Sequence, residues 1–364
     1  MATRDATWAY RDGHDEGFAR AYWRLFGDAV VSSIGVGTYL GDATDAVDRA
    51  YEEAIIEALE GGVNVVDTAI NYRHQRSERA VGAAVERVDV DREAVVVATK
   101  GGFVPFDGTR PDDPARYLHE AFLDPGLVDP DDLVGNVHSL APDFLDAMVD
   151  RSLSNLGLDA VDCYYVHNPE FQLRDRSRAA VYDALEAAFA RLERRAAAGD
   201  LAHYGVATWE AFRVPPDHEQ YLSLPEVHRR AQAASDAAGT ETTHFQAVQL
   251  PFNVRMADAF TLPAHEGPDG RVSALEYASR AGLDVFTSAS IGQGDLADAD
   301  ALPDAVAARL NGETPAQRAL NFARSAPGVT TSLVGNATRE HVRENVAAGE
   351  HLPMDAGAFD ATFE

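Results

Sequence analysis

The run Val95-Val96-Val97-Ala98-Thr99, followed directly by Lys100, is the stretch of this sequence that decides its fold. It is almost continuously apolar, as expected for a strand that is buried on both faces of a parallel sheet. The preceding run Val63-Asn64-Val65-Val66-Asp67 has the same character, and a segment of helical period over residues 76–87 separates the two. A strand, a helix and a strand in this order predict a parallel βαβ unit.

Outward from these two runs, the same alternation continues along the whole chain. Eight strand-then-helix units favour closure into a barrel over an open sheet. We therefore predict one α/β domain over residues 1–364, with the (β/α)8 TIM-barrel fold. The candidate strands are 30–36, 63–67, 95–99, 161–166, 203–207, 245–250, 284–287 and 329–334, and the candidate helices lie near 46–60, 76–87, 143–156, 179–198, 226–238, 273–281, 315–325 and 338–348.

Three long connections follow strands, which in a barrel places them on the C-terminal face, where active sites lie. They are residues 101–141, 208–225 and 288–314. The insertion 101–141 is rich in Asp, Pro and Gly, a composition that fits either a substrate lid or an acidic surface decoration. Residues 1–28 precede the first predicted strand and are expected to cap the bottom of the barrel.

The charge balance excludes several classes of partner. The 364 residues carry 59 acids against 31 bases, a formal net charge of −28. Nucleic acid and anionic membrane surfaces both require a basic face, so we expect neither as a partner. The single cysteine, Cys163, lies in an apolar run and indicates a buried thiol in a reducing compartment. The N-terminus lacks an apolar segment, so we expect no signal peptide and a cytoplasmic protein, with oligomerisation left open.

The acidic surface also indicates the ionic environment. Thirty of the 31 bases are arginine, and an acidic, lysine-poor surface resembles that of halophilic proteins from a high-salt cytoplasm. Dense carboxylates repel one another when little salt screens them. The melting temperature is therefore expected to fall markedly when salt is lowered from molar to millimolar concentration. Coincident melting curves at the two salt concentrations would contradict this interpretation.

Polar residues gather where three neighbouring strands end. Asp67, Lys100 and His167 end the second, third and fourth predicted strands, and Tyr72 follows Asp67 by five residues. Taken singly, Asp67 could cap a turn, Tyr72 could be a packing aromatic and His167 could be a structural histidine. Lys100 is different because it is the only lysine in the chain. Arginine cannot replace a compact ammonium whose pKa shifts on burial, so this position points to function.

Together these four residue types indicate one chemistry. A phenol is a weak acid near neutral pH, and we expect the Lys100 ammonium to lower the pKa of Tyr72. Asp67 would hold that ammonium in place, and His167 would orient a carbonyl oxygen. No side chain supplies a hydride, so reduction of a carbonyl would need a cofactor.

These residues resemble the motifs of the aldo-keto reductase superfamily. The resemblance includes the Asp67-to-Tyr72 step with Ser77-Glu78 after it, Lys100 after its apolar run, and Val161-Asp162-Cys163-Tyr164-Tyr165-Val166-His167. It extends over nearly the whole chain, from about residue 31 to about 348. By this resemblance Tyr72 is the general acid, Lys100 and Asp67 tune it, and His167 orients an aldehyde or ketone. The family usually takes hydride from NADPH, so the resemblance implies NADP(H) more than NAD(H).

The resemblance also implies positions that bind the cofactor. Thr208 and Gln249 stand where the family holds the carboxamide, although the family commonly has Ser-Asn at the first position. Ser288 stands where an aromatic residue often stacks on nicotinamide, so this stack is predicted to be absent. Gly292-Gln293-Gly294 resembles the loop over the pyrophosphate. Towards the end of the chain the implied contacts are Glu344 and Asn345 for adenine and Arg339 for a 2′-phosphate.

Three alternatives compete with this interpretation. A barrel that binds NADP(H) as a regulatory or redox-sensing subunit, with little turnover, would fit the altered nicotinamide position. An open-sheet dehydrogenase would use Gly35, Gly37 and Gly41 as a dinucleotide loop, but the third glycine falls one residue late. A metal-dependent hydrolase is disfavoured because the twelve histidines include no ligand pair at helical spacing, so no metal is predicted.

Overall fold

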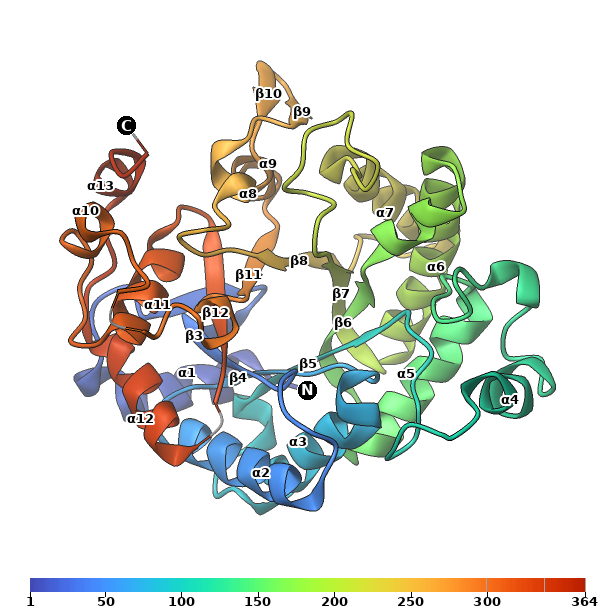
Figure 1. The fold of residues 1–364 in the computed structure, drawn as a ribbon, viewed down its shortest axis with the longest axis horizontal. Coiled ribbons are helices and arrows are strands. Elements are labelled where there is room, and N and C mark those ends of the chain that lie inside the picture. The colour runs from blue at the N-terminus through green and yellow to red at the C-terminus, as the bar shows by residue number, and fades with distance from the viewer. Residues whose placement is uncertain (299, 337, 364) are drawn as a thin grey trace.

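A computed structural model describes residues 1–298, 300–336 and 338–363. Its centre is a closed barrel of eight parallel strands that are hydrogen-bonded in chain order (Figure 1). The predicted barrel is thus confirmed. The barrel strands are β3 (Ile34–Gly37), β4 (Val65–Asp67), β5 (Val96–Gly101), β6 (Val161–His167), β7 (Leu201–Ala207), β8 (Phe245–Pro251), β11 (Asp284–Ser288) and β12 (Val329–Gly335).

A ring of helices surrounds the barrel, one after each strand (Figure 1). Their apolar faces pack on the outward side chains of the strands and form the main hydrophobic core. No helix in the described part of the chain is long and apolar enough to cross a membrane. The ring consists of α2 (Asp45–Glu60), α3 (Arg76–Arg87), α5 (Pro142–Leu156), α6 (Arg178–Ala198), α7 (Leu224–Ala238), α9 (Ala274–Ala281), α11 (Pro315–Ser325) and α12 (Arg339–Ala347).

Local sequence signals set the ends of these helices. Thr44 and Ser177 cap α2 and α6 because their side chains accept hydrogen bonds from backbone N–H groups of the first turn. Gly199 and Gly282 end α6 and α9 with φ values of 90° and 72°, the left-handed conformation that glycine adopts without steric cost. Each of these two glycines lets the chain turn back into the next strand.

The predicted strand 30–36 is wrong as a single element. The chain forms β2 (Ala29–Ser32), which pairs antiparallel with β1 (Trp23–Phe26), and then begins β3 at Ile34. The break occurs at Ser33, whose backbone N–H donates to the Tyr22 carbonyl. The Asn64 side chain accepts from the Ser32 N–H at 2.8 Å and thereby replaces a strand partner. The apolar pattern is continuous across the break, so periodicity could not reveal it.

The N-terminal segment closes the bottom of the barrel, as expected. Phe26 and Val31 of the β1–β2 hairpin join the cluster of inward-facing barrel residues, and the Phe26 ring lies 5.1 Å from that of Phe286. Helix α1 (Arg4–His14) packs on β2. The interior is therefore a packed core at this end, and only the opposite end is available for a site.

The insertion 101–141 packs beside the barrel. Its residues Leu118, Phe122 and Val128 are buried in the main core, and α4 (Pro114–Leu118) lies outside the ring of helices in Figure 1. Its role as a lid stays a prediction. The remaining short elements are α8 (Asp258–Thr261), β9 (His265–Gly267), β10 (Gly270–Val272), α10 (Asp304–Ala307) and α13 (Ala356–Asp360).

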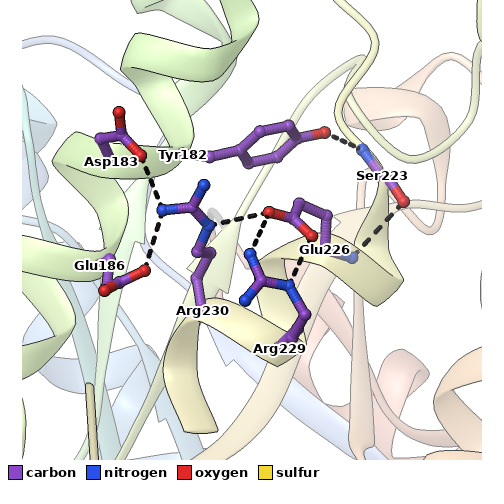
Figure 2. Close-up of polar contacts among 7 residues, drawn as sticks. All are labelled: Tyr182, Asp183, Glu186, Ser223, Glu226, Arg229 and Arg230. Carbon is purple, nitrogen blue, oxygen red and sulfur yellow. Dashed lines mark hydrogen bonds and ion pairs between the residues drawn. The ribbon is translucent and has the colours of Figure 1, made fainter. Parts of the chain in front are cut away.

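An ion-pair cluster joins α6 and α7 (Figure 2). Glu226 accepts hydrogen bonds from Arg229 and Arg230, and Arg230 also pairs with Asp183 and Glu186 at 2.7 and 2.8 Å. Hydrogen bonds from these two arginines lower the pKa of Glu226 to about 2, against an ordinary value of 4.5. A depressed carboxylate pKa stabilises the folded state at every pH above the ordinary value.

Glu226→Gln is expected to lower the free energy of unfolding by about 1 kcal/mol at pH 7, because solvent screens this partly exposed cluster. The difference from the unmodified protein should shrink as the pH falls from 4.5 towards 2, where Glu226 itself becomes protonated. Denaturant titration measures both quantities. The exposed Glu241 supplies the matched control, Glu241→Gln, which should change neither. A loss that does not depend on pH would show that the carboxylate charge is not responsible.

Candidate active site

The carboxyl ends of three adjacent strands bring the predicted residues together. Asp67 ends β4, Lys100 lies one residue before the end of β5, and His167 ends β6. Tyr72 follows β4 in a turn that the β5 strand supports, because the Ile70 N–H donates to the Lys100 carbonyl at 3.2 Å. All four side chains therefore lie at the open end of the barrel, as the sequence predicted.

Lys100 lies at the centre of this group and is fully buried. Its ammonium pairs with Asp67, donates to the Thr68 carbonyl at 2.8 Å, and lies 4.7 Å from the centre of the Tyr72 ring. The second oxygen of Asp67 accepts from the Gln249 amide at 2.8 Å. Both carboxylate oxygens are thus satisfied, as a buried ion pair requires.

The Lys100 ammonium lowers the pKa of Tyr72, as expected, but the net shift is upward because the effect of burial is larger. For Lys100, burial acts to lower the pKa, but Asp67 and Tyr72 outweigh it and the pKa is raised. At neutral pH the site therefore holds a protonated phenol beside an ammonium, which is the state that a proton donor needs.

His167 is neutral at this pH. Burial, and then the charge of Lys100, lower its pKa well below the ordinary value. Its ring lies 5.8 Å from that of Tyr72, centre to centre. One ring nitrogen of His138, a residue of the insertion, accepts a hydrogen bond from the Gln172 amide. The other ring nitrogen therefore carries the proton and donates to the His167 carbonyl at 2.7 Å. This contact holds the backbone of His167 in place, and no local pattern of residues could have revealed it.

The backbone directly after Tyr72 is strained. Arg73, His74 and Gln75 have φ values of 48°, 60° and 70°, an uncommon conformation for three successive residues other than glycine. The buried Arg73 side chain binds Asp48 and the carbonyls of Asp42 and Thr44, which holds the turn. Sequence reasoning missed Arg73 because these partners lie 25 to 31 residues away in the chain.

A groove begins at Asp67, Tyr72 and His167 and runs outward between the ends of the strands and α12. It consists of two adjoining cavities of about 360 and 370 Å³. They share the lining residues Leu40, Ile291, Gln293 and Gly335. The inner cavity contains Tyr72 and His167, and the outer one ends at Asn345. A groove of this shape suits an extended ligand with one end at Tyr72.

Most of the predicted cofactor residues line this groove. Thr208, Gln249 and Ser288 line the inner cavity, Gln293 lines both, and Gly294, Glu344 and Asn345 line the outer one. Gly292 belongs to the same turn but is not part of the lining. Arg339 also lies outside the lining, and its side chain faces Glu53 and Glu57 at 3.5 and 3.6 Å.

The inner cavity fits the carboxamide of a nicotinamide ring. The Thr208 hydroxyl is buried and has no hydrogen-bond partner within the described chain, and Gln249 lies in the next strand. An amide ligand would supply the missing partner. The segment Ser288–Ile291 lines the same cavity without an aromatic ring, whereas Tyr39, Phe103 and Trp209 provide the rings elsewhere in its wall.

Cys163 is fully buried, and burial raises the pKa of its thiol, so it is an inert core residue as predicted. No group of three or more His, Cys, Asp or Glu side chains in the described ranges is arranged to hold a metal ion.

Comparison with known proteins gives a consistent result. A model of the Aldo/keto reductase family matches residues 33–215. A putative voltage-gated potassium channel subunit beta of Schizosaccharomyces pombe is 22% identical over 337 residues, which cover 88% of this chain and 86% of that protein. An NADH-specific methylglyoxal reductase of Escherichia coli is 32% identical over 145 residues, which cover 38% of this chain and 39% of the relative.

Among solved structures, an aldo/keto reductase from Klebsiella pneumoniae in complex with NADP and acetate has a similar fold. The TM-score is 0.60 at 19% sequence identity, with 95% of this chain and 96% of the other covered.

Proposed function

This chain belongs to the aldo/keto reductase family, and from that premise we propose that it interconverts an aldehyde or ketone and its alcohol, with Tyr72 as the general acid. As a member of this family it is an NAD(P)-dependent oxidoreductase, and the family acts on small carbonyl compounds. The observation that carries the proposal is the meeting of Tyr72, Lys100, Asp67 and His167 at one end of a groove.

In the direction of reduction, the protein has to deliver a proton to the carbonyl oxygen as the carbon receives a hydride. Tyr72 donates this proton from its hydroxyl group. Lys100 stabilises the phenolate that remains, and Asp67 keeps Lys100 in position. His167, neutral at this pH, can donate its one N–H to the carbonyl oxygen and so orient the substrate.

The bound nicotinamide supplies the hydride, because no side chain can. Thr208 and Gln249 would hold its carboxamide, and Ser288 would lie beside the ring without stacking on it. The turn Gly292-Gln293-Gly294, with backbone in the left-handed region, would approach the pyrophosphate closely. Asn345 and Glu344 would meet the adenosine end. The family resemblance favours NADP(H) over NAD(H). The charged residues along the groove also affect which of the two cofactors binds more tightly.

The pKa shifts predict a flat pH profile. Burial raises the pKa of Tyr72 above 10.0 and lowers that of His167 well below 6.5. Tyr72 therefore keeps its proton, and His167 stays neutral, throughout the interval between these values. The kcat/KM for carbonyl reduction is expected to stay constant within about twofold from pH 6.5 to 9.5. A tenfold decline centred inside this interval would contradict one of the two assignments.

Steady-state assays test the proposal directly. The purified protein, in molar salt, is mixed with NADH or NADPH and a panel of aldehydes and ketones, and the cofactor absorbance is followed. We expect oxidation of the cofactor that depends on the carbonyl compound and that Tyr72→Phe lowers by about 10²-fold or more. Tight cofactor binding without turnover on any member of the panel would refute the enzymatic proposal.

The second candidate function is a nicotinamide-binding regulatory barrel with little turnover. It is favoured by the absence of an aromatic residue among Ser288–Ile291, since a weakly held ring would slow hydride transfer. The similarity to a putative channel subunit over most of the chain points in the same direction. The same assay separates the two candidates, because the regulatory barrel would bind the cofactor without consuming it.

A further inference from the structure

We propose that the adenosine end of the groove is built for NAD(H) and discriminates against NADP(H), because its described lining supplies no free arginine or lysine for a 2′-phosphate. The inference rests on the proposed function, because it concerns the cofactor of the same site. It departs from the preference for NADP(H) that the sequence resemblance implied, and it follows from the charges along the groove.

Among the described residues, the lining of the groove contains no basic side chain other than histidine. Neither cavity is lined by an arginine or a lysine in the described part of the chain, and the ionisable residues of the outer cavity include Glu344 and His341. A 2′-phosphate adds up to two negative charges, which usually require an arginine or lysine nearby. Here the lining contains Glu344, whose charge has the same sign as that of a phosphate.

The arginines closest to this end are already paired with acids. On α12, Arg343 donates to Glu57 of α2 at 2.6 Å, and Arg339 lies 3.5 to 3.6 Å from Glu53 and Glu57. These contacts turn both guanidinium groups towards α2. A phosphate would have to compete with two carboxylates for Arg339.

Arg73 is also unavailable, although it stacks on Tyr51 of the outer cavity at 5.2 Å. Its side chain is only 1% exposed and is bound to Asp48 and to backbone carbonyls. Releasing it would undo the strained turn that holds Tyr72. Within the described chain, no arginine or lysine can therefore reach the groove without breaking an existing contact.

The negative charge of Glu344 adds to the preference for NAD(H). It lies on the side of α12 that faces the groove, next to Asn345, whose amide is held by Asn336 at 2.7 Å. A carboxylate accepts hydrogen bonds from the hydroxyl or amino groups of an unmodified adenosine, and it repels a phosphate on the ribose. The same logic assigns an acidic residue to the ribose of NAD in dinucleotide-binding folds.

Equilibrium binding tests the inference without relying on turnover. The full chain is titrated with NADH and with NADPH, at one salt concentration that keeps it folded, and protein fluorescence gives the two Kd values. We expect NADH to bind at least tenfold more tightly. Competition by 5′-ADP and by 2′,5′-ADP repeats the comparison at the adenosine end alone, where 5′-ADP should be the better competitor.

Three variants test which residues cause the difference in Kd between NADH and NADPH. Glu344→Gln removes a negative charge that favours NADH over NADPH, so it should narrow the ratio of the two Kd values several-fold, whereas the control Glu340→Gln, an exposed position on the same helix, should leave that ratio unchanged. Arg339→Ala should also leave the Kd for NADPH unchanged. Tighter binding of NADPH than NADH, or a tenfold loss of NADPH binding in Arg339→Ala, would overturn the inference while leaving the proposed function intact. Failure of both dinucleotides to bind would overturn both proposals.

Discussion

Tyr72→Phe is expected to lower kcat for carbonyl reduction by about 10²- to 10⁴-fold, the usual contribution of a general acid. The substitution removes one hydroxyl group and keeps the ring that packs against Tyr39 and His167. The Kd for the cofactor and the melting temperature should therefore change little. Because the lost interaction acts only on the reacting oxygen, kcat and kcat/KM should fall together.

The chain offers a matched control for this experiment. Tyr39 lines the same cavity, its ring lies 5.0 Å from that of Tyr72, and it is more than half exposed. Tyr39→Phe removes the same hydroxyl group from the neighbouring phenol and should retain turnover within a few-fold. If Tyr39→Phe lost activity and Tyr72→Phe kept it, the proton donor would have been assigned to the wrong tyrosine.

Lys100→Met is expected to lower turnover by about 10²-fold or more, since the phenolate left by proton transfer would lose its only neighbouring ammonium. It should also destabilise the fold by about 3–5 kcal/mol, because Asp67 would remain buried with only the Gln249 amide as partner. Single-turnover kinetics at saturating cofactor measures the first effect, and denaturant titration measures the second.

A double variant separates stability from catalysis. Lys100→Met combined with Asp67→Asn removes the buried charge along with its partner, so part of the lost stability should return while turnover stays low. Lys100→Arg keeps the positive charge, but its planar fork is too wide for a site with no exposure, so it should not rescue turnover. Near-normal turnover in Lys100→Met would show that the ammonium does not support the acid.

The barrel and the positions of its catalytic candidates could be predicted from the sequence because both depend on short-range patterns. Buried parallel strands are continuous apolar runs, and Asp67, Lys100 and His167 each follow one. Once the strands are parallel and adjacent, their ends must meet at one rim. Lys100 also pointed to function because it is the only lysine in the chain, which is a property of composition and not of spacing.

Features that depend on distant contacts could not be predicted. The break at Ser33 depends on Tyr22 and on the side chain of Asn64. The turn after Tyr72 depends on Arg73 reaching Asp48, and His167 depends on His138 of the insertion. The direction of the Tyr72 pKa shift required a balance between burial and one neighbouring charge, and the sequence gives only the charge. Likewise, nothing local to Arg339 indicates that it faces Glu53 and Glu57.

The central claim is that Tyr72, Lys100 and His167 surround the place where a carbonyl oxygen lies beside the nicotinamide. A crystal structure of the protein with NADH or NADPH and a substrate analogue tests it most directly. The account predicts the carboxamide near Thr208 and Gln249, and an analogue oxygen within hydrogen-bond distance of both the Tyr72 hydroxyl and the His167 ring. A nicotinamide ring bound outside the inner cavity, or an analogue oxygen that contacts neither side chain, would contradict it.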